Sequence, residues 1–495
     1  MTPRRLRPAT SFVALVAVAA LAIGTGPSLA GPAGPSRSAS VAGPFRAGSP
    51  SFNGTLFGSS FELSRVGYES SRFFLSGTAR SFVPVRALTA DGEWRVRAGA
   101  SAPYRTRVAV YRPIDPRRFN GTVIVEWLNV SGGVDAGPDW TLAHNELVRE
   151  GFAWVGVSAQ AVGVAATRKA DPADYASLSH PGDSFSYDIF SQAGQAVRRR
   201  AAVMLGGLRL RRLIAVGESQ SAFRLVSYID AVEPLAHVYD GFLVHSRFAG
   251  AAPLSQSPQP DIAAPTPTMI RADLHVPVFV FETETDVSLS NTADRLHHYP
   301  SGPYRLWEVA GSAHYDDYGL AIGPNDVGRG RGAVLNLAAM QHPTADPAPG
   351  SLPSCTSPIN TGGTHWVLDA AVHWLNRWVA NGTPPPRAPT LAVARRSPVV
   401  FARDGGGNVR GGARSPQVAV PLAALTGVGN NPAFCSLFGT TVPYTAGQLA
   451  RRYSSHKQFV SRWDRATTED VAAGYLLSAD AAELKASAAA SRIGT

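Results

Sequence analysis

The sequence predicts an α/β protein whose mostly parallel sheet is covered by helices on both faces. Apolar runs without polar alternation, at 121–130, 152–160 and 212–219, are typical of strands buried on both sides. Amphipathic stretches at 138–151 and 183–199 alternate with them, as in βαβ units. The chain has 495 residues, 44% of them hydrophobic and 17% charged. That length allows one large core with additions, or two domains, and the composition excludes a disordered chain.

The remaining elements follow the same alternation as far as residue 311. Glycine and proline punctuate the runs, and the last long helix has aromatic and aliphatic residues at helical spacing. A later "TAGQ" near Thr445 is typical of a capping box. We expect further strands over 72–83, 105–114, 239–247, 276–284 and 304–311, and further helices over 221–232 and 364–382.

The first thirty residues predict a signal peptide, 1–30. Three arginines precede an apolar run at 11–24, and small residues stand before Ala30, as signal peptidase requires. The apolar run is too short to span a bilayer comfortably. An uncleaved membrane anchor is the alternative. No later stretch is long and apolar enough for a membrane span, so we expect a secreted or cell-envelope protein.

Composition divides the rest of the chain. Small residues with proline, glycine and serine predict a flexible linker over 31–50. An α/β domain follows over 51–382. Within it, 251–272 carries five prolines and no regular pattern, which is typical of a lid or rim loop. Residues 383–495 form a C-terminal extension that we expect to pack on the α/β domain.

The charge and the cysteines limit the partners. The formal net charge is +10, and removing the leader's three arginines leaves about +7. The arginines are scattered, which argues against nucleic-acid binding. In an exported chain, Cys355 and Cys435 are candidates for a disulfide, with two buried thiols as the alternative.

The stretch "VGESQSA" carries the candidate nucleophile. It follows a strand and opens a helix, and in an open α/β sheet functional groups sit at the carboxyl ends of strands. A serine on so sharp a turn needs small residues two before and two after it. Ser219 has Gly217 and Ser221 there, whereas Ser221 would have Phe223. Ser219 is therefore the candidate, with a helix N-cap serine as the alternative.

Chain order supplies an acid and a base. A serine nucleophile needs a base, and the base needs a carboxylate; in this architecture both follow the serine, acid first. The strand over 276–284 leads to Asp286, with Glu284 as the alternative acid. The next strand leads to His314, which could otherwise be a hydrogen-bonded loop histidine. Asp316 and Asp317 beside it match no common metal pattern, so we predict no metal.

An oxyanion hole needs two backbone N–H donors. The residue after the nucleophile, Gln220, supplies one. The glycine-rich loop after the strand over 121–130 supplies the other, from Val130 or Ser131. A plain glycine-rich turn is the alternative for that loop.

Five strings resemble a known family: "GESQSA", "VEWLNVSGG", "SHPGDSFSYDIFSQAG", "RLWEVAGSAH" and "VGNNPAFCSLFG". They resemble the bacterial α/β-hydrolase domain proteins of the Abhydrolase-10 type, from about residue 45 to the C-terminus. The resemblance implies an α/β-hydrolase fold. It also implies a triad of Ser219, Asp286 and His314, the positions reached from the residues.

The sequence therefore predicts a secreted serine hydrolase that cleaves carboxylic esters through an acyl-enzyme. We expect a small-molecule ester substrate and no cofactor, and we predict no oligomeric state. An acyltransferase or an amidase would use the same triad. A hydrolase fold kept as a non-catalytic binding or scaffold protein is the alternative from another class.

Overall fold

The computed structural model describes residues 39–45, 58–290, 295, 302–347 and 354–494. These belong to one compact unit, Pro35–Thr495. The expected signal peptide lies outside the described residues. The expectation of a flexible linker over 31–50 is wrong for Ser40–Phe45, which form strand β1 and pair with β2. Strand pairing satisfies their backbone groups, which composition alone does not reveal.

A nine-stranded sheet organises the described residues, in the order β1-β2-β3-β5-β4-β6-β7-β8-β9. In this order, the strands from β5 to β9 run parallel to one another. β1, β2 and β3 add an antiparallel part, in which β3 pairs with β5. Two small two-stranded sheets lie in the C-terminal extension. The strands are β1 (Ser40–Phe45), β2 (Tyr68–Pro84), β3 (Val96–Pro113), β4 (Thr122–Trp127), β5 (Ala153–Val157), β6 (Arg212–Glu218), β7 (Gly241–His245), β8 (Val278–Glu282), β9 (Tyr304–Glu308), β10 (Val393–Arg396), β11 (Val399–Phe401), β12 (Ala423–Thr426) and β13 (Thr440–Pro443).

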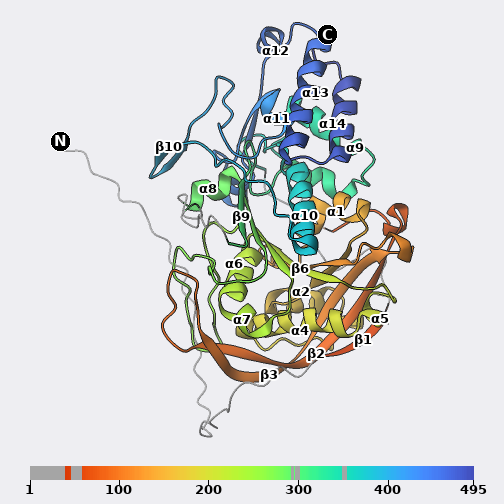
Figure 1. Ribbon diagram of the computed structural model, residues 1–495, viewed down its shortest axis with the longest axis vertical. Coiled ribbons are helices and arrows are strands. Elements are labelled where there is room, and N and C mark those ends of the chain that lie inside the picture. The colour runs from red at the N-terminus through yellow and green to blue at the C-terminus, as the bar shows by residue number, and fades with distance from the viewer. Residues whose placement is uncertain (1–38, 46–57, 291–294, 296–301, 348–353, 495) are drawn as a thin grey trace, which may run out of the picture. The chain divides into compact units, whose positions relative to one another are not determined.

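Helices cover both faces of the parallel strands (Figure 1). Some helices belong to the α/β domain and others to the extension. The helices are α1 (Pro138–Arg149), α2 (Ala161–Ala170), α3 (Pro172–Tyr175), α4 (Ser186–Arg199), α5 (Ala201–Met204), α6 (Gln220–Ser227), α7 (Glu233–Ala236), α8 (Glu284–Ser290), α9 (Arg331–Gln341), α10 (Thr364–Asn381), α11 (Pro416–Ala419), α12 (Ala446–Arg452), α13 (His456–Ala473) and α14 (Ser478–Ala490).

Side chains alternate along each strand between two hydrophobic cores. On β6, Leu213 and Ala215 pack with α4 and α6, whereas Ile214 and Val216 pack with α1 and α10. Both faces of the parallel strands are therefore buried, which explains why the sequences of these strands are continuous apolar runs.

The predicted elements appear close to their expected positions, with differences at the ends. The helix expected over 221–232 is α6 followed by a π-helical turn, Tyr228–Val232. β2 and β3 are longer than the apolar runs suggested, because they pair with each other along most of their length.

The extension contributes to a third core together with α9 and α10. Phe459 and Trp463 of α13 are fully buried there, as is Trp366 of α10. Thr445 caps α12 in a capping box with Gln448, as its sequence suggested. Among the described residues, the helices are too short or too polar for any of them to traverse a bilayer.

Candidate active site

The turn between β6 and α6 presents Ser219. Its φ of 58° and ψ of −120° lie outside the usual regions for a non-glycine residue. The neighbouring positions must be small, since a Cβ at Gly217 would lie 3.0 Å from the backbone oxygen of Ser221. The chain thus exposes the Ser219 hydroxyl at the carboxyl end of the sheet, as a nucleophile elbow requires.

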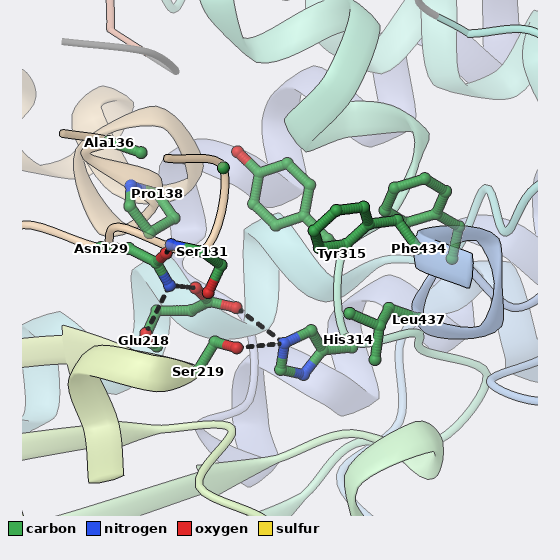
Figure 2. Close-up of a pocket in the computed structure, with 12 residues that line it drawn as sticks. Asn129, Ser131, Ala136, Pro138, Glu218, Ser219, His314, Tyr315, Phe434 and Leu437 are labelled. Atoms are coloured by element: carbon green, nitrogen blue, oxygen red, sulfur yellow. Dashed lines mark hydrogen bonds and ion pairs between the residues drawn. The ribbon is translucent and has the colours of Figure 1, made fainter. Parts of the chain in front are cut away.

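The segments after β6, β8 and β9 bring Ser219, Asp286 and His314 into a continuous hydrogen-bonded chain (Figure 2 shows the bond between Ser219 and His314). His314 Nε2 lies 2.8 Å from Ser219 Oγ, and His314 Nδ1 lies 2.7 Å from Asp286 Oδ1. Because Asp286 accepts at Nδ1, the geometry assigns the proton of a neutral imidazole to Nδ1. Nε2 is then free to accept the hydroxyl proton of Ser219.

The surroundings of Asp286 favour its charged form. Burial pushes its pKa upward, but His314 and hydrogen bonds from Ser246 and Thr283 outweigh burial and hold the pKa below its ordinary value. Asp286 Oδ2 accepts from the Ser246 hydroxyl at 2.6 Å and from the Thr283 backbone and hydroxyl at 2.7 Å. Asp286 lies in the first turn of α8, where the sequence suggested a loop, and the helix fixes its direction.

Glu284, the alternative acid, points elsewhere. Its Oε1 accepts from the backbone N–H of Gly311 at 2.8 Å, and its Oε2 accepts from Gly427 and Arg403 at 3.2 Å each. Glu284 therefore links α8 to the loop that carries His314 and to the extension. The structure brings Asp286, and not Glu284, to the imidazole.

The two candidate oxyanion donors after β4 differ in availability. The backbone N–H of Ser131 donates to Asn129 Oδ1 at 2.7 Å. Within the described part of the chain, the N–H groups of Val130 and Gln220 meet no acceptor. Gln220 is the first residue of α6, so its free N–H belongs to the positive end of the helix dipole. Of the two candidates after β4, Val130 therefore has a free backbone N–H, whereas that of Ser131 is already hydrogen-bonded.

Glu218 is a site residue that the sequence analysis did not single out. Its Oε1 lies 3.2 Å from His314 Nε2, and Asn129 Nδ2 donates to its Oε2 at 3.2 Å (Figure 2). Burial raises its pKa well above the ordinary value, and nearby Asp139 and Asp286 add to the rise against the opposing effect of His245. The sequence signal that could have identified Glu218 is its position directly before Ser219.

Two further side chains support the imidazole and the turn. The ring of Phe248 stacks on that of His314 with centroids 4.6 Å apart. His245, at the end of β7, is fully buried, and its Nδ1 lies 2.8 Å from Asp139 Oδ1. Burial opposes its protonation, but the nearby carboxyls, Asp139 foremost with Glu218 and Asp286, outweigh burial and raise the pKa of His245. The backbone oxygen of His245 accepts from the Ser219 N–H at 2.9 Å, and its imidazole is held by Asp139 beside the site.

A pocket of about 120 Å³ opens at Ser219 and His314. Asn129, Ser131 and Glu218 line one part, and Tyr315, Phe434 and Leu437 line another (Figure 2). Phe438 also lines the pocket. None of its lining residues comes from 251–272, the expected lid or rim loop. That loop packs instead on α4 and α6, for example through Tyr187 to Pro253 and Ser227 to Ala252.

The part of the extension that lines this pocket is covalently tied to the segment before α10. Cys355 and Cys435 form a disulfide with an S–S distance of 2.05 Å, as the cysteine pair suggested. Nothing in local sequence connects Phe434 or Leu437 with Ser219, more than two hundred residues earlier. The resemblance of "VGNNPAFCSLFG" was the one hint that this segment mattered.

One group of side chains in the described residues has the spacing of metal ligands: Glu146, Glu150 and His373. Glu146 is already paired with Arg149 at 2.7 Å and lies 3.2 Å from His373. The group is a partly exposed ion-pair cluster, and it carries no metal assignment.

The fold and the arrangement of the site define the class of an α/β hydrolase. The model of the family described as "Alpha/beta hydrolase domain", Abhydrolase_10, matches residues 38–486, and the chain belongs to that family. No curated protein matches the sequence.

Solved structures show weaker likenesses. An esterase from Rhizomucor miehei is 13% identical over 47% of this chain and 74% of its own, with a TM-score of 0.25. A carboxylesterase from Lactobacillus plantarum is 12% identical over 46% and 82%, with a TM-score of 0.26. A serine hydrolase homologue from Coxiella burnetii is 13% identical over 43% and 84%, with a TM-score of 0.26. Likenesses at these scores add nothing to the family assignment.

Proposed function

We propose that this α/β hydrolase is an exported serine hydrolase that cleaves carboxylic esters of small molecules. The observation that carries the proposal is the chain of hydrogen bonds from Ser219 through His314 to Asp286. Nucleophile, base and orienting carboxylate are the parts that acyl transfer needs. The basic, apolar N-terminus supports export.

In the first half of the reaction, Ser219 Oγ attacks the ester carbonyl and His314 Nε2 takes the hydroxyl proton. Asp286, held ionised, stabilises the resulting imidazolium through Nδ1. The backbone N–H groups of Gln220 and Val130 receive the oxyanion. When the tetrahedral intermediate collapses, Nε2 returns the proton to the departing alcohol.

In the second half, a water molecule replaces the alcohol. His314 Nε2 takes a proton from the water, which attacks the acyl group on Ser219. Collapse of the second tetrahedral intermediate releases the acid and restores the Ser219 hydroxyl. The same residues would transfer the acyl group to another alcohol or cleave an amide, so the acceptor and the leaving group distinguish these reactions.

The test is labelling with a fluorophosphonate probe together with hydrolysis of p-nitrophenyl esters. Wild-type protein should be labelled and active, and Ser219→Ala should lose the label and about four to six orders of magnitude in kcat. Ser221→Ala, at the neighbouring small position, is the control and should keep the label. An unlabelled, inactive wild type would favour the scaffold alternative, and transfer to an added alcohol in preference to water would favour an acyltransferase.

A further inference from the structure

The C-terminal extension builds one wall of the pocket. Phe434, Leu437 and Phe438 line it next to Tyr315, and Figure 2 shows Phe434 and Leu437 across the pocket from Asn129. Phe434 is 43% exposed, whereas Phe438 is only 5% exposed. The ring of Phe434 therefore stands at the rim and that of Phe438 lies deeper. A substrate meets only apolar groups and one tyrosine on this side.

The wall is held in place from two directions. The disulfide ties Cys435 to Cys355. The backbone oxygen of Leu437 accepts from the N–H of Tyr315 at 3.2 Å, and that of Phe438 accepts from the N–H of Asn360 at 2.9 Å. Because Tyr315 follows His314, the wall and the base keep a constant spacing. A substrate group must fit the space between them, since the wall cannot easily withdraw.

The size of the pocket limits what fits. At about 120 Å³, it is smaller than the ~300–1,000 Å³ of sites for drug-sized ligands. We propose that residues 433–438 determine specificity, and that the substrate is an ester with a compact apolar group seated against Phe434 and Leu437. This proposal rests on the ester hydrolysis proposed above and names its substrate class.

The wall should discriminate by chain length. Each methylene that is buried against it gains about fourfold in kcat/KM. A chain that outgrows the pocket must displace Phe434 or remain in water, so the gain stops abruptly. Shortening Phe434 or Leu437 should move that limit to longer chains, and enlarging Phe434 should move it to shorter ones.

The experiment measures kcat/KM along two ester series. One is p-nitrophenyl esters from acetate to decanoate, and the other is acetate esters of alcohols from methanol to octanol. The variants are Phe434→Ala, Leu437→Ala and Phe434→Trp. Val442→Ala is the matched control, because Val442 lies in β13 of the same extension, is 60% exposed and does not line the pocket.

In one series, the long-to-short ratio of kcat/KM should rise at least about tenfold in Phe434→Ala and Leu437→Ala. It should fall in Phe434→Trp and stay unchanged in Val442→Ala. The responding series identifies whether the acyl or the alcohol half sits at the wall. Unchanged ratios in both series, with hydrolysis and Ser219 labelling intact, would overturn the specificity wall alone. If the wild type shows neither labelling nor hydrolysis, the proposed function is overturned, and the specificity proposal that rests on it is overturned as well.

Discussion

At the scale of single residues, the imidazole of His314 has a carboxyl oxygen near each ring nitrogen. Asp286 lies at Nδ1 and Glu218 at Nε2. Their environments separate their behaviour: the pKa of Asp286 is held low by His314 and its hydrogen bonds against burial, whereas burial raises that of Glu218. Asp286 therefore keeps its charge, whereas Glu218 gives up its proton at a higher pH than an ordinary glutamate does.

Substitutions of Asp286 and Glu284 should show which of the two carboxylates orients His314. Asp286→Asn should lower kcat by about three to four orders of magnitude, because the imidazole loses its orienting charge. Glu284→Gln should keep kcat within about tenfold while lowering the free energy of unfolding by about 1–3 kcal/mol, since it weakens contacts to Gly311, Gly427 and Arg403. Steady-state kinetics and thermal melts check both variants, and the reverse pattern would make Glu284 the acid.

Glu218→Gln should change the pH dependence of kcat/KM. As the pH rises, Glu218 loses its proton, and the carboxylate then stabilises the imidazolium at the Nε2 of His314. Besides His314, the titratable groups that interact with Glu218 are His245, Asp139, Asp286 and Tyr315, and the substitution leaves them in place. Glutamine cannot ionise, so the acid limb should move to lower pH by about half a unit or more.

A pH–rate profile of wild type and Glu218→Gln measures this shift. A merely structural role for Glu218 would lower the amplitude and leave the midpoint where it is. The same raised pKa predicts that Glu218 favours the folded state below pH ~4.3, the ordinary glutamate value. That contribution is lost as the pH rises through the folded-state value.

At the scale of elements, the turn between β6 and α6 determines where the Ser219 hydroxyl lies. Glu218 is the last residue of β6 and Ser219 follows it, so both lie at the carboxyl end of the parallel strands. The positive φ of Ser219 turns its hydroxyl outward. The strands β8 and β9 run parallel to β7 and so end on the same side of the sheet. This is why an acid and a histidine far apart in sequence meet the serine.

Gly217→Ala tests the crowding of this turn. The added Cβ would lie 3.0 Å from the backbone oxygen of Ser221, so the elbow must shift. We expect a loss of about 1–3 kcal/mol in the free energy of unfolding and a lower kcat, because Ser219 moves relative to His314. Denaturant titration and ester hydrolysis measure the two effects.

Ser221→Ala is the control for the turn. The Ser221 hydroxyl is buried and has no hydrogen-bond partner among the residues that the structure describes. Alanine keeps the position small, so stability and activity should stay close to wild type. Equal losses in Gly217→Ala and Ser221→Ala would contradict the steric account of Gly217.

At the scale of the whole molecule, the extension is part of the hydrolase rather than an appendage. It shares a hydrophobic core with α9 and α10, it places Phe434 and Leu437 at the pocket, and the disulfide closes a separation of 80 residues. Folding of the extension and completion of the pocket are therefore coupled, although Ser219, Asp286 and His314 all precede the extension.

Removing the disulfide should affect stability and substrate binding together. A cross-link over this separation constrains the unfolded chain by about 4 kcal/mol, so Cys355→Ala/Cys435→Ala should melt well below wild type. KM should rise more than kcat falls, because the wall loosens while the triad stays connected. Reductant should reproduce both changes in wild type and have no effect on the double variant; equal melting temperatures would contradict the account.

The sequence alone predicted the α/β class, the order of the main strands and helices, and the residues Ser219, His314 and Asp286 that the structure joins. The α/β class is confirmed, and the three side chains lie within hydrogen-bonding distance. Period, turn chemistry and chain order could predict this much because they are local or sequential signals. Only the tertiary structure decided that Glu218 lies at Nε2, that Asp286 rather than Glu284 reaches His314, and that Phe434 and Leu437 reach the pocket. These facts depend on side-chain directions and on contacts between distant segments, which packing determines and no local pattern records.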